Sequence, residues 1–521
     1  MLRLTAFVSF FALFAQAPPA SFPLEEASVA QLQEWMTSGR YTARQITDLY
    51  LKRIEEIDRR GPELRAVIEI NPDATSIADG LDAERLAKGP RGPLHGIPVL
   101  IKDNIDTADR MQTTAGSLAL EGEPALVDAF LVQRLRAAGV VVIGKTNLSE
   151  WANFRSTHSS SGWSGRGGQV KNPYALDRNP CGSSSGTGAA IAANLAAVGV
   201  GTETDGSIVC PSAAIGLVGI KPTLGLVSRT GIVPIAHSQD TAGSMARSVA
   251  DAAALLTAMT GVDPADPDSV RSRGHIARDY TSSLDAGALK GARVGVARKQ
   301  YFGYSAATDE LMDRAIADLK AQGATIVDPA DIPTASKLDA CENEVLLYEF
   351  KADVKKYLAA RGRSVRVHSL EELIAFNERE KTREMPYFGQ ELFIQAQKKG
   401  PLTSPAYRAA LTKCRALARQ QGIDLVMGRH TLDALIAPTG SPAWTTDLVN
   451  GDHFLGASST PGAVAGYPSI TVPAGDVRGL PVGISFIGRA WSEPRLIALA
   501  YAYEQATKHR RVPQFKAGVD Q

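Results

Sequence analysis

Short apolar runs, each long enough for a buried strand, alternate with amphipathic stretches along most of this 521-residue chain. Strands that alternate with helices predict a sheet buried between helical layers. One helix is expected to begin after Thr42, because Thr42 and Gln45 form a capping box ahead of an apolar face over residues 46–57. The apolar runs are residues 97–101, 140–143, 198–201, 217–220, 294–297, 435–437, 469–472 and 482–487.

Two later segments lack this alternation. Residues 263–289 are rich in Asp, Ser and Pro, which indicates a surface excursion inside the fold and not a linker between domains. Residues 338–422 are charged and helical in pattern, and we expect them to form a cover over the sheet. We therefore predict one domain over residues 21–521.

The first twenty residues are typical of a secretory signal peptide. Arg3 precedes a nearly continuous apolar run over residues 4–14, and Ala15-Gln16-Ala17 offers a small-x-small cleavage site. The run is too short to span a bilayer as a helix. The alternative, a buried N-terminal helix, would end at once at Pro18-Pro19. Removal of residues 1–20 predicts a periplasmic or secreted protein with no stable membrane anchor.

Charge and cysteine content exclude several classes of function. The 56 basic and 55 acidic residues give a net charge of +1, so no basic excess exists for nucleic-acid binding. The cysteines are too few and too scattered for a disulfide scaffold or a CxxC zinc site, although an exported protein is compatible with one or two bridges. They are Cys181, Cys210, Cys341 and Cys414.

Residues 180–188 form an unusual Gly- and Ser-rich segment ahead of an Ala-rich helix. A phosphate-binding loop is one interpretation, but the Lys-Ser/Thr and G-x-G-x-x-G patterns are missing. Residues 182–186 also fit the G-x-S-x-G nucleophile elbow, although the preceding residues 171–178 are polar and turn-rich, unlike a strand. A turn without chemistry is the third interpretation. An elbow needs a histidine, and none stands in a distinctive setting among His237, His275, His368, His430, His453 and His509.

Lys102 ends the apolar run 97–101, where a charged side chain is costly unless it is paired, solvated or neutral. Burial disfavours the ammonium form, so such a lysine can have a lowered pKa and act as a base. Lys145 and Lys221 follow apolar runs in the same way. Each of the three can instead extend its amine to water, and the local pattern does not separate them.

Taken in order, several motifs resemble the amidase signature family of serine hydrolases. The resemblance covers nearly the whole chain after residue 20 and is densest over residues 93–251. It implies one amidase signature domain of the α/β class, with a large mixed central sheet covered on both faces by helices, and no metal or cofactor. The motifs are residues 93–98, 102–104, 144–147, 172–173, 182–186, 201–208, 219–223 and 479–483.

The family's Ser–Ser–Lys triad corresponds by position to Ser207, Ser183 and Lys102. The resemblance implies that Ser207 is the nucleophile, that Lys102 is the base, and that Ser183 bridges them after a cis Gly182–Ser183 peptide bond. The implied oxyanion hole consists of the backbone N–H groups of Thr204, Asp205, Gly206 and Ser207.

The chain departs from the family beside this triad. Where the family commonly has Asp-Thr-Gly-Gly-Ser-Ile-Arg, this chain has Glu203-Thr204-Asp205-Gly206-Ser207-Ile208-Val209, and Cys181 replaces a common glycine. These differences leave the triad intact and alter the oxyanion loop and the adjacent acyl pocket. Cys181 and Cys210 flank the two serines, so either a disulfide or two buried thiols would fit there.

Residues 181–183, 203–211 and 436–444 are similar to the bacterial peptide amidase branch of the family. This resemblance implies an exported amidase that hydrolyses carboxamides, above all C-terminal peptide amides, to carboxylate and ammonia through an acyl-enzyme. Its expected partner is a small-molecule or peptide amide. Three alternatives remain: an amidase of other small or fatty amides, a glutaminase-type subunit of a tRNA amidotransferase, and a non-catalytic binding protein. The export signal argues against the second, and the complete triad argues against the third.

Overall fold

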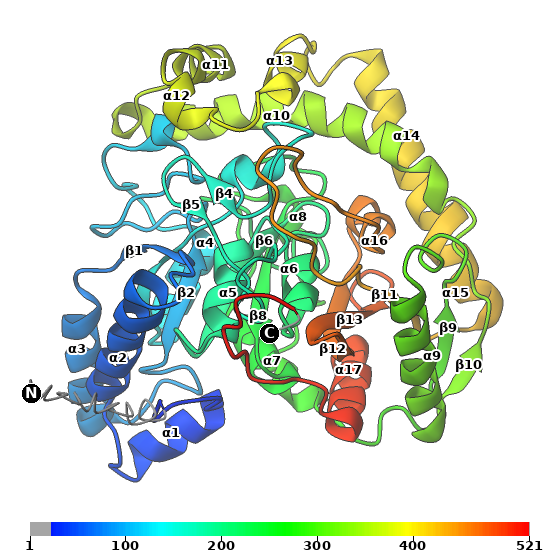
Figure 1. Cartoon of the computed structure of the whole chain (residues 1–521), viewed down its shortest axis with the longest axis horizontal. Coiled ribbons are helices and arrows are strands. Elements are labelled where there is room, and N and C mark those ends of the chain that lie inside the picture. The colour runs from blue at the N-terminus through cyan, green and yellow to red at the C-terminus, as the bar shows by residue number, and fades with distance from the viewer. Residues whose placement is uncertain (1–21, 520–521) are drawn as a thin grey trace, which may run out of the picture.

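The apolar runs form the strands of one central sheet (Figure 1). The computed structural model describes residues 22–519, so the predicted signal peptide, residues 1–20, lies outside the described residues. Within residues 22–519 the sheet has eleven strands in the order β1-β3-β2-β6-β8-β7-β12-β13-β11-β9-β10. Their bounds are β1 (Val67–Ile70), β2 (Pro98–Lys102), β3 (Val141–Thr146), β6 (Val198–Glu203), β7 (Val218–Lys221), β8 (Thr241–Ala246), β9 (Arg293–Val296), β10 (Thr325–Val327), β11 (Ala434–Pro438), β12 (Ser469–Val477) and β13 (Leu480–Ile487), with a separate hairpin of β4 (Trp163–Ser164) and β5 (Gly168–Gln169).

The sheet is mixed. Strand β2 runs parallel to both of its neighbours, β3 and β6, and β9 runs parallel to β10 and β11. The strands between these two parallel groups, from β6 to β11 in the sheet order, pair antiparallel. The predicted α/β fold with a large mixed sheet flanked by helices is therefore confirmed.

Helices flank the strands in two groups. Helices α5 and α6 pack together and contact the central strands, while α7, α9 and α17 form a second packed group. The capping box at Thr42 is present at the start of α2, as predicted. The helices that surround the sheet are α1 (Val29–Thr37), α2 (Ala43–Arg53), α3 (Ala74–Lys88), α4 (Phe130–Ala137), α5 (Ser185–Ala192), α6 (Val209–Ala214), α7 (Val249–Met259), α8 (Pro267–Val270), α9 (Ala306–Ala321), α15 (Asp424–His430), α16 (Thr460–Ala465) and α17 (Glu493–Thr507).

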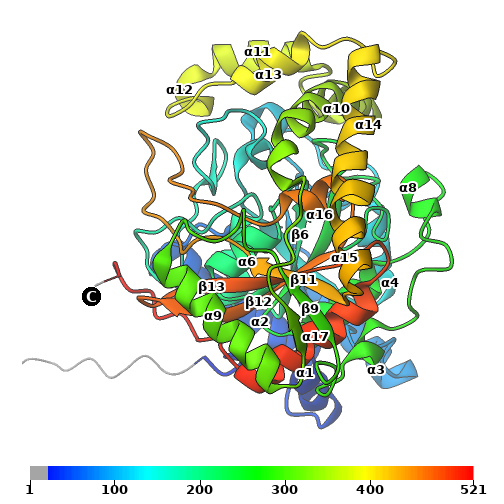
Figure 2. The same ribbon diagram turned by 90° about the vertical axis from the view of Figure 1, so that its right-hand side faces the viewer.

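The segment 263–289 is a surface excursion, as expected, and its short helix α8 stands at the edge of the molecule in Figure 2. No helix among the described residues combines the length and the apolar character that a bilayer-spanning segment needs.

The helical cover lies only partly where it was predicted. Its helices pack mainly on the loops at one end of the sheet (Figures 1 and 2), and Leu417, near the end of the cover, shares an apolar cluster with Leu435 of β11. In the cluster shared with the loops, Phe350 and Phe393 of the cover contact Trp151. A disulfide between Cys341 and Cys414 joins two of the cover helices. The cover consists of α10 (Asp339–Arg361), α11 (Leu370–Arg379), α12 (Lys381–Glu384), α13 (Glu391–Gln397) and α14 (Pro405–Ala418).

Strand β8 lies beside the central strand of the sheet, but its sequence has no apolar run that would predict a strand. Strands β1 and β10 were not predicted either. The β8 sequence, TAGSMA, is completely buried. A Cβ atom on Gly243 would lie 2.0 Å from the Ile220 carbonyl oxygen and 2.9 Å from Ile208 Cδ1. Close packing therefore selects small residues here and removes the pattern by which strands are recognised.

We expect Gly243→Ala to lower the free energy of unfolding by about 2–3 kcal/mol, because the added methyl group overpacks the sheet centre. Urea unfolding followed by circular dichroism measures the change. Gly80→Ala is the matched control, since a Cβ there meets no atom within 4 Å in helix α3. That control should be neutral or more stable by about 1 kcal/mol. A Gly243→Ala protein as stable as wild type would contradict the packing argument.

Candidate active site

The amine of Lys102 is enclosed at the end of β2, where the side chain is completely buried. Lys102 Nζ lies 2.7 Å from Ser183 Oγ and 2.9 Å from Thr202 Oγ1. Burial lowers the pKa of Lys102 to about 7, although the negative charges of Glu203 and Asp240 act in the opposite direction. Near neutral pH a large fraction of Lys102 is therefore uncharged and able to accept a proton.

The two lysines in similar sequence settings face different groups. Lys221 Nζ donates to the carbonyl oxygen of Tyr467 at 2.6 Å, and a carbonyl has no proton to relay. Lys145 Nζ donates to the Ile105 carbonyl at 2.6 Å and to Thr113 Oγ1 at 2.9 Å, and the Thr113 hydroxyl itself donates to the same Ile105 carbonyl at 3.2 Å. Of the three candidates, Lys102 is the lysine that contacts a serine hydroxyl.

Ser183 lies in the Gly- and Ser-rich turn just before α5, and the Gly182–Ser183 peptide bond is cis, as the resemblance implied. The turn is anchored on both sides. The Ser149 N–H donates to the Ser183 carbonyl at 3.1 Å, and Ser185 Oγ donates to the Cys181 carbonyl at 2.6 Å. Within the described part of the chain, no strand leads into this turn and no histidine hydrogen-bonds to its serines, so the nucleophile-elbow interpretation is not supported.

Ser207 precedes α6 and is adjacent to the same turn. The Ser184 N–H donates to the Ser207 carbonyl at 3.1 Å, and a disulfide between Cys181 and Cys210 joins the turn to α6. Among the described residues Ser207 makes no side-chain hydrogen bond to Ser183. The structure therefore brings Lys102 and Ser183 into direct contact and holds Ser207 beside them through the main chain and one disulfide.

The oxyanion loop, residues 204–207, keeps its backbone donors available. None of these four N–H groups donates a hydrogen bond within the described chain. The next two, those of Ile208 and Val209, both donate to Glu203 Oε2, at 2.8 and 3.0 Å. Gly206 has a φ of +81°, which a residue with a side chain rarely adopts. The loop thus presents a row of unpaired N–H groups, an arrangement that can bind a negatively charged oxygen.

Asp205 is an unexpected carboxyl group in such a loop. Its Oδ2 accepts a hydrogen bond from Thr460 Oγ1 at 2.7 Å, whereas its Oδ1 is buried without a partner. Burial raises the pKa of Asp205, and burial together with the charge of Asp205 raises the pKa of Glu342 well above its ordinary value. Both shifts favour the protonated form of the pair, which limits the negative charge beside the oxyanion loop.

A cleft of about 620 Å³ opens over the two serine-bearing loops and is lined by Gly182 and Gly206 from them. Three carboxyl groups also line it, those of Asp205, Asp339 and Asp452. Within the described residues, no Lys or Arg side chain does so. The cleft therefore disfavours an anionic ligand group.

Aromatic side chains form one wall of the cleft. Trp444 and Phe454 meet edge to face with ring centroids 5.6 Å apart, and Trp444 Nε1 donates to Asp452 at 3.2 Å. Tyr467 does not line the cleft; it packs in another apolar cluster and donates its hydroxyl to Asp424 at 2.9 Å.

Sequence reasoning missed the residues that support the oxyanion loop. Asp240 Oδ1 accepts a hydrogen bond from Thr204 Oγ1 at 2.6 Å, and Gln239 Nε2 donates to the Thr204 carbonyl at 3.3 Å. Thr202, which contacts Lys102, was missed as well. A two-residue spacing places Thr202 and Thr204 on one side of the chain, but only the tertiary structure shows what lies opposite them.

Comparison with known proteins gives a consistent family. The family model described as Amidase matches residues 45–497. The crystal structure of native peptide amidase from Stenotrophomonas maltophilia is 52% identical, with a TM-score of 0.91, covering 95% of this chain and 99% of that one. A probable amidase of Arabidopsis thaliana is 41% identical over 96% of this chain and 93% of its own length. A glutamyl-tRNA(Gln) amidotransferase subunit of Halorhodospira halophila is 35% identical over 94% of this chain and 99% of its own length.

The charge of Glu203 favours the ammonium form of Lys102, so Glu203→Gln should lower the pKa of Lys102 further. Glutamine retains an acceptor for the two N–H groups of α6. The measurement is an NMR titration of the lysine ¹³Cε resonance that disappears in Lys102→Ala. Glu493→Gln is the matched control, because Glu493 is equally buried but acts on Lys221. An unchanged titration in Glu203→Gln, or an equal shift in both variants, would contradict this assignment.

Proposed function

Because the chain belongs to the amidase family and is an amide hydrolase, we propose that it hydrolyses C-terminal peptide amides to carboxylate and ammonia through a serine acyl-enzyme. The observation that carries the mechanism is the 2.7 Å contact between the buried Lys102 amine and the Ser183 hydroxyl. A lysine in this state can start a proton relay that ends at a neighbouring nucleophile.

In this mechanism Ser207 is the nucleophile. Neutral Lys102 accepts the proton of the Ser183 hydroxyl, and Ser183 Oγ takes the proton of Ser207 as Ser207 Oγ attacks the amide carbonyl. The unpaired N–H groups of residues 204–207 stabilise the oxyanion of the tetrahedral intermediate, where a single donor typically contributes about 3 kcal/mol. Gly206 lines the cleft and contributes no side chain of its own there.

The same relay works in reverse for the leaving group. Ser183 returns a proton to the departing nitrogen, which leaves as ammonia, and Lys102 replaces the proton on Ser183. Water then attacks the acyl-enzyme and gives a proton to Ser183 Oγ, while Lys102 accepts the proton of the Ser183 hydroxyl. As the acyl–oxygen bond breaks, Ser183 gives a proton to Ser207 Oγ, and Lys102 returns its proton to Ser183. Lys102, Ser183 and water carry every proton in this scheme.

The charge of the cleft supports an uncharged C-terminal carboxamide as the substrate group. Asp339 and Asp452 would repel a peptide that ends in a free carboxylate. They would also repel the carboxylate product once it forms, which favours its release. The aromatic wall of Trp444 and Phe454 offers apolar surface to the side chains of a short peptide. The likeness to a peptide amidase from Stenotrophomonas maltophilia supports the same substrate class.

The alternatives fit the cleft less well. Free glutamine carries a carboxylate that needs a cationic partner, and Val209 stands where the family commonly has arginine. A long fatty chain would have to lie against three carboxyl groups. A non-catalytic binding protein has no need for a buried uncharged lysine beside a serine hydroxyl.

We also propose that the protein acts in the periplasm or outside the cell. The signal-like pattern of residues 1–20 supports export. Two disulfides, Cys181–Cys210 and Cys341–Cys414, fit an oxidising compartment.

Ser207→Ala should abolish ammonia release and leave circular dichroism and the melting temperature close to wild type. Lys102→Ala should lower kcat at neutral pH by about 10³-fold or more and recover partly at high pH, where hydroxide replaces the base. In the wild type, kcat should rise with pH through about 7, because the protonated lysine below that pH cannot accept a proton. Wild-type turnover by a clean Ser207→Ala preparation would refute the nucleophile.

A substrate panel tests the cleft argument. We expect a dipeptide C-terminal amide to exceed free glutamine, a small aliphatic amide and a long-chain fatty amide in kcat/KM by about 100-fold. Ammonia release by the purified protein after signal removal is the measurement, with Ser207→Ala as the blank. Asp339→Asn should bind the product carboxylate more tightly than wild type, since one repelling charge is gone. Preferential hydrolysis of glutamine would favour the amidotransferase alternative.

A further inference from the structure

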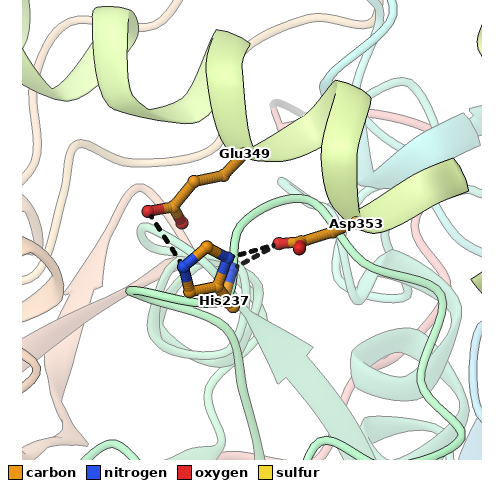
Figure 3. A group of neighbouring side chains, drawn as sticks. All are labelled: His237, Glu349 and Asp353. Carbon is orange, nitrogen blue, oxygen red and sulfur yellow. Dashed lines mark hydrogen bonds and ion pairs between the residues drawn. The ribbon is translucent and has the colours of Figure 1, made fainter. Parts of the chain in front are cut away.

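His237 lies between two carboxylates of α10, outside the proposed triad (Figure 3). His237 Nδ1 is 2.8 Å from Asp353 Oδ2, and His237 Nε2 is 3.5 Å from Glu349 Oε1. The backbone N–H of His237 also donates to Asp353 Oδ2, at 2.9 Å. One histidine is thus fastened to the cover helix at three points.

The three side chains are already paired with one another. The two ring nitrogens face different carboxylates, Nδ1 facing Asp353 and Nε2 facing Glu349, as Figure 3 shows. The oxygens of Glu349 already accept hydrogen bonds from Tyr407 Oη at 2.6 Å and from the Ser238 N–H at 2.9 Å. The cluster is therefore an ion-paired clamp between a loop and a helix.

The clamped loop, residues 235–240, contacts the oxyanion loop, residues 204–207, through hydrogen bonds. Asp240 Oδ2 closes the loop by accepting two of its own N–H groups, while Asp240 Oδ1 accepts the Thr204 hydroxyl at 2.6 Å. Gln239 Nε2 donates both to the Thr204 carbonyl at 3.3 Å and to Glu342 of α10 at 2.7 Å. A continuous chain of polar contacts thus joins α10 to Thr204.

We propose that His237 is a positioning residue: its clamp on α10 fixes the loop 235–240, which holds Thr204 and thereby sets the geometry of the oxyanion loop. This inference rests on the proposed function for its catalytic consequence. No disulfide joins this loop to the cover in the described chain, because the disulfides join Cys181 to Cys210 and Cys341 to Cys414, so the loop is held to α10 by non-covalent contacts.

The charge of the clamp depends on pH, and the groups around His237 determine the direction in which its pKa shifts. Burial lowers the pKa of His237, but the hydrogen bond to Asp353 and the charges of Glu349 and Asp353 outweigh burial and raise the pKa above its ordinary value. Arg229, on the segment before the loop, opposes this weakly. The clamp is therefore charged below the raised pKa of His237, and it loses its charge as the pH rises through that pKa.

The two ionisations act on activity in opposite directions. Lys102 must be uncharged to accept a proton, so activity rises through pH about 7, while loss of the His237 charge, as the pH rises through its raised pKa, should reduce activity. Burial also raises the pKa of Glu349, which faces His237, and Tyr407 of α14 donates to Glu349. Protonation of Glu349 at acidic pH therefore weakens the clamp where Lys102 is already protonated.

The first experiment compares His237→Gln with His368→Gln. His368 is an exposed histidine in the same cover and serves as the matched control. Active sites are counted with a fluorophosphonate probe, and kcat is expressed per titrated site. We expect His237→Gln to lower kcat by about tenfold with KM changed less than about twofold, because the oxyanion contact forms mainly in the transition state. A purely structural role would lower the number of titrated sites and not kcat per site.

His237→Arg retains the positive charge at all relevant pH values and tests the alkaline limb. The His237 side chain is 39% exposed, which leaves room for the larger group. We expect His237→Arg to keep wild-type kcat at neutral pH and to lose the alkaline decline, whereas His237→Gln has the lower kcat throughout. An alkaline decline that is identical in wild type and His237→Arg would overturn the charged clamp.

Hydrogen exchange gives a readout that needs no turnover. In His237→Gln, the amides of residues 208–210, which donate to Glu203 and to the Gly206 carbonyl of the oxyanion loop, should exchange faster, together with those of residues 235–240, while His368→Gln matches wild type. Faster exchange confined to residues 235–240 would overturn the inference. If the wild type releases no ammonia from any amide, the proposed function fails, but the exchange result still decides whether His237 holds the oxyanion loop.

Discussion

The site depends on keeping a lysine amine out of water without giving it a carboxylate partner. Parallel pairing of β2 with β6 brings the ends of both strands together, so that Lys102 meets Thr202. Successive side chains on a strand point to opposite faces, and the carboxylate of Glu203 is therefore directed at the first turn of α6. The end of β6 thus supplies the Thr202 hydroxyl to Lys102 and the Glu203 carboxylate to the helix that follows Ser207. Because these two side chains point to opposite faces, the carboxylate does not contact the lysine.

Apolar runs in the sequence predicted most strands of the sheet, but strands without such a run were not predicted. The eight apolar runs became strands, whereas β8, with Gly243 at its centre, is built from small residues because neighbouring backbone leaves no space. The cover expected over the sheet packs mainly on the loops, where its apolar residues contact Trp151 and its neighbours. Amphipathic periodicity shows that a helix has a buried face but not which partner buries it.

The site was predictable to the extent that its chemistry is local. Ordered motifs placed Lys102, Ser183 and Ser207 through family resemblance, and the structure brings all three to one end of the sheet. Asp339 and Asp452, which give the cleft its charge, come from segments far along the chain with no distinctive pattern. Their role depends on a tertiary arrangement that neither composition nor spacing contains.

The cover is coupled to the oxyanion loop for a physical reason. Glu342, Glu349 and Asp353 are seven and then four residues apart, which places them on one stripe of α10. Buried carboxyls are costly unless they are paired or hydrogen-bonded, and the loop 235–240 supplies those partners. Since the same loop binds Thr204, the contacts that satisfy the acids of α10 also orient the oxyanion loop. A substitution in α10 that changes the cleft at Asp339 must therefore leave Glu342, Glu349 and Asp353 in place if the oxyanion loop is to keep its orientation.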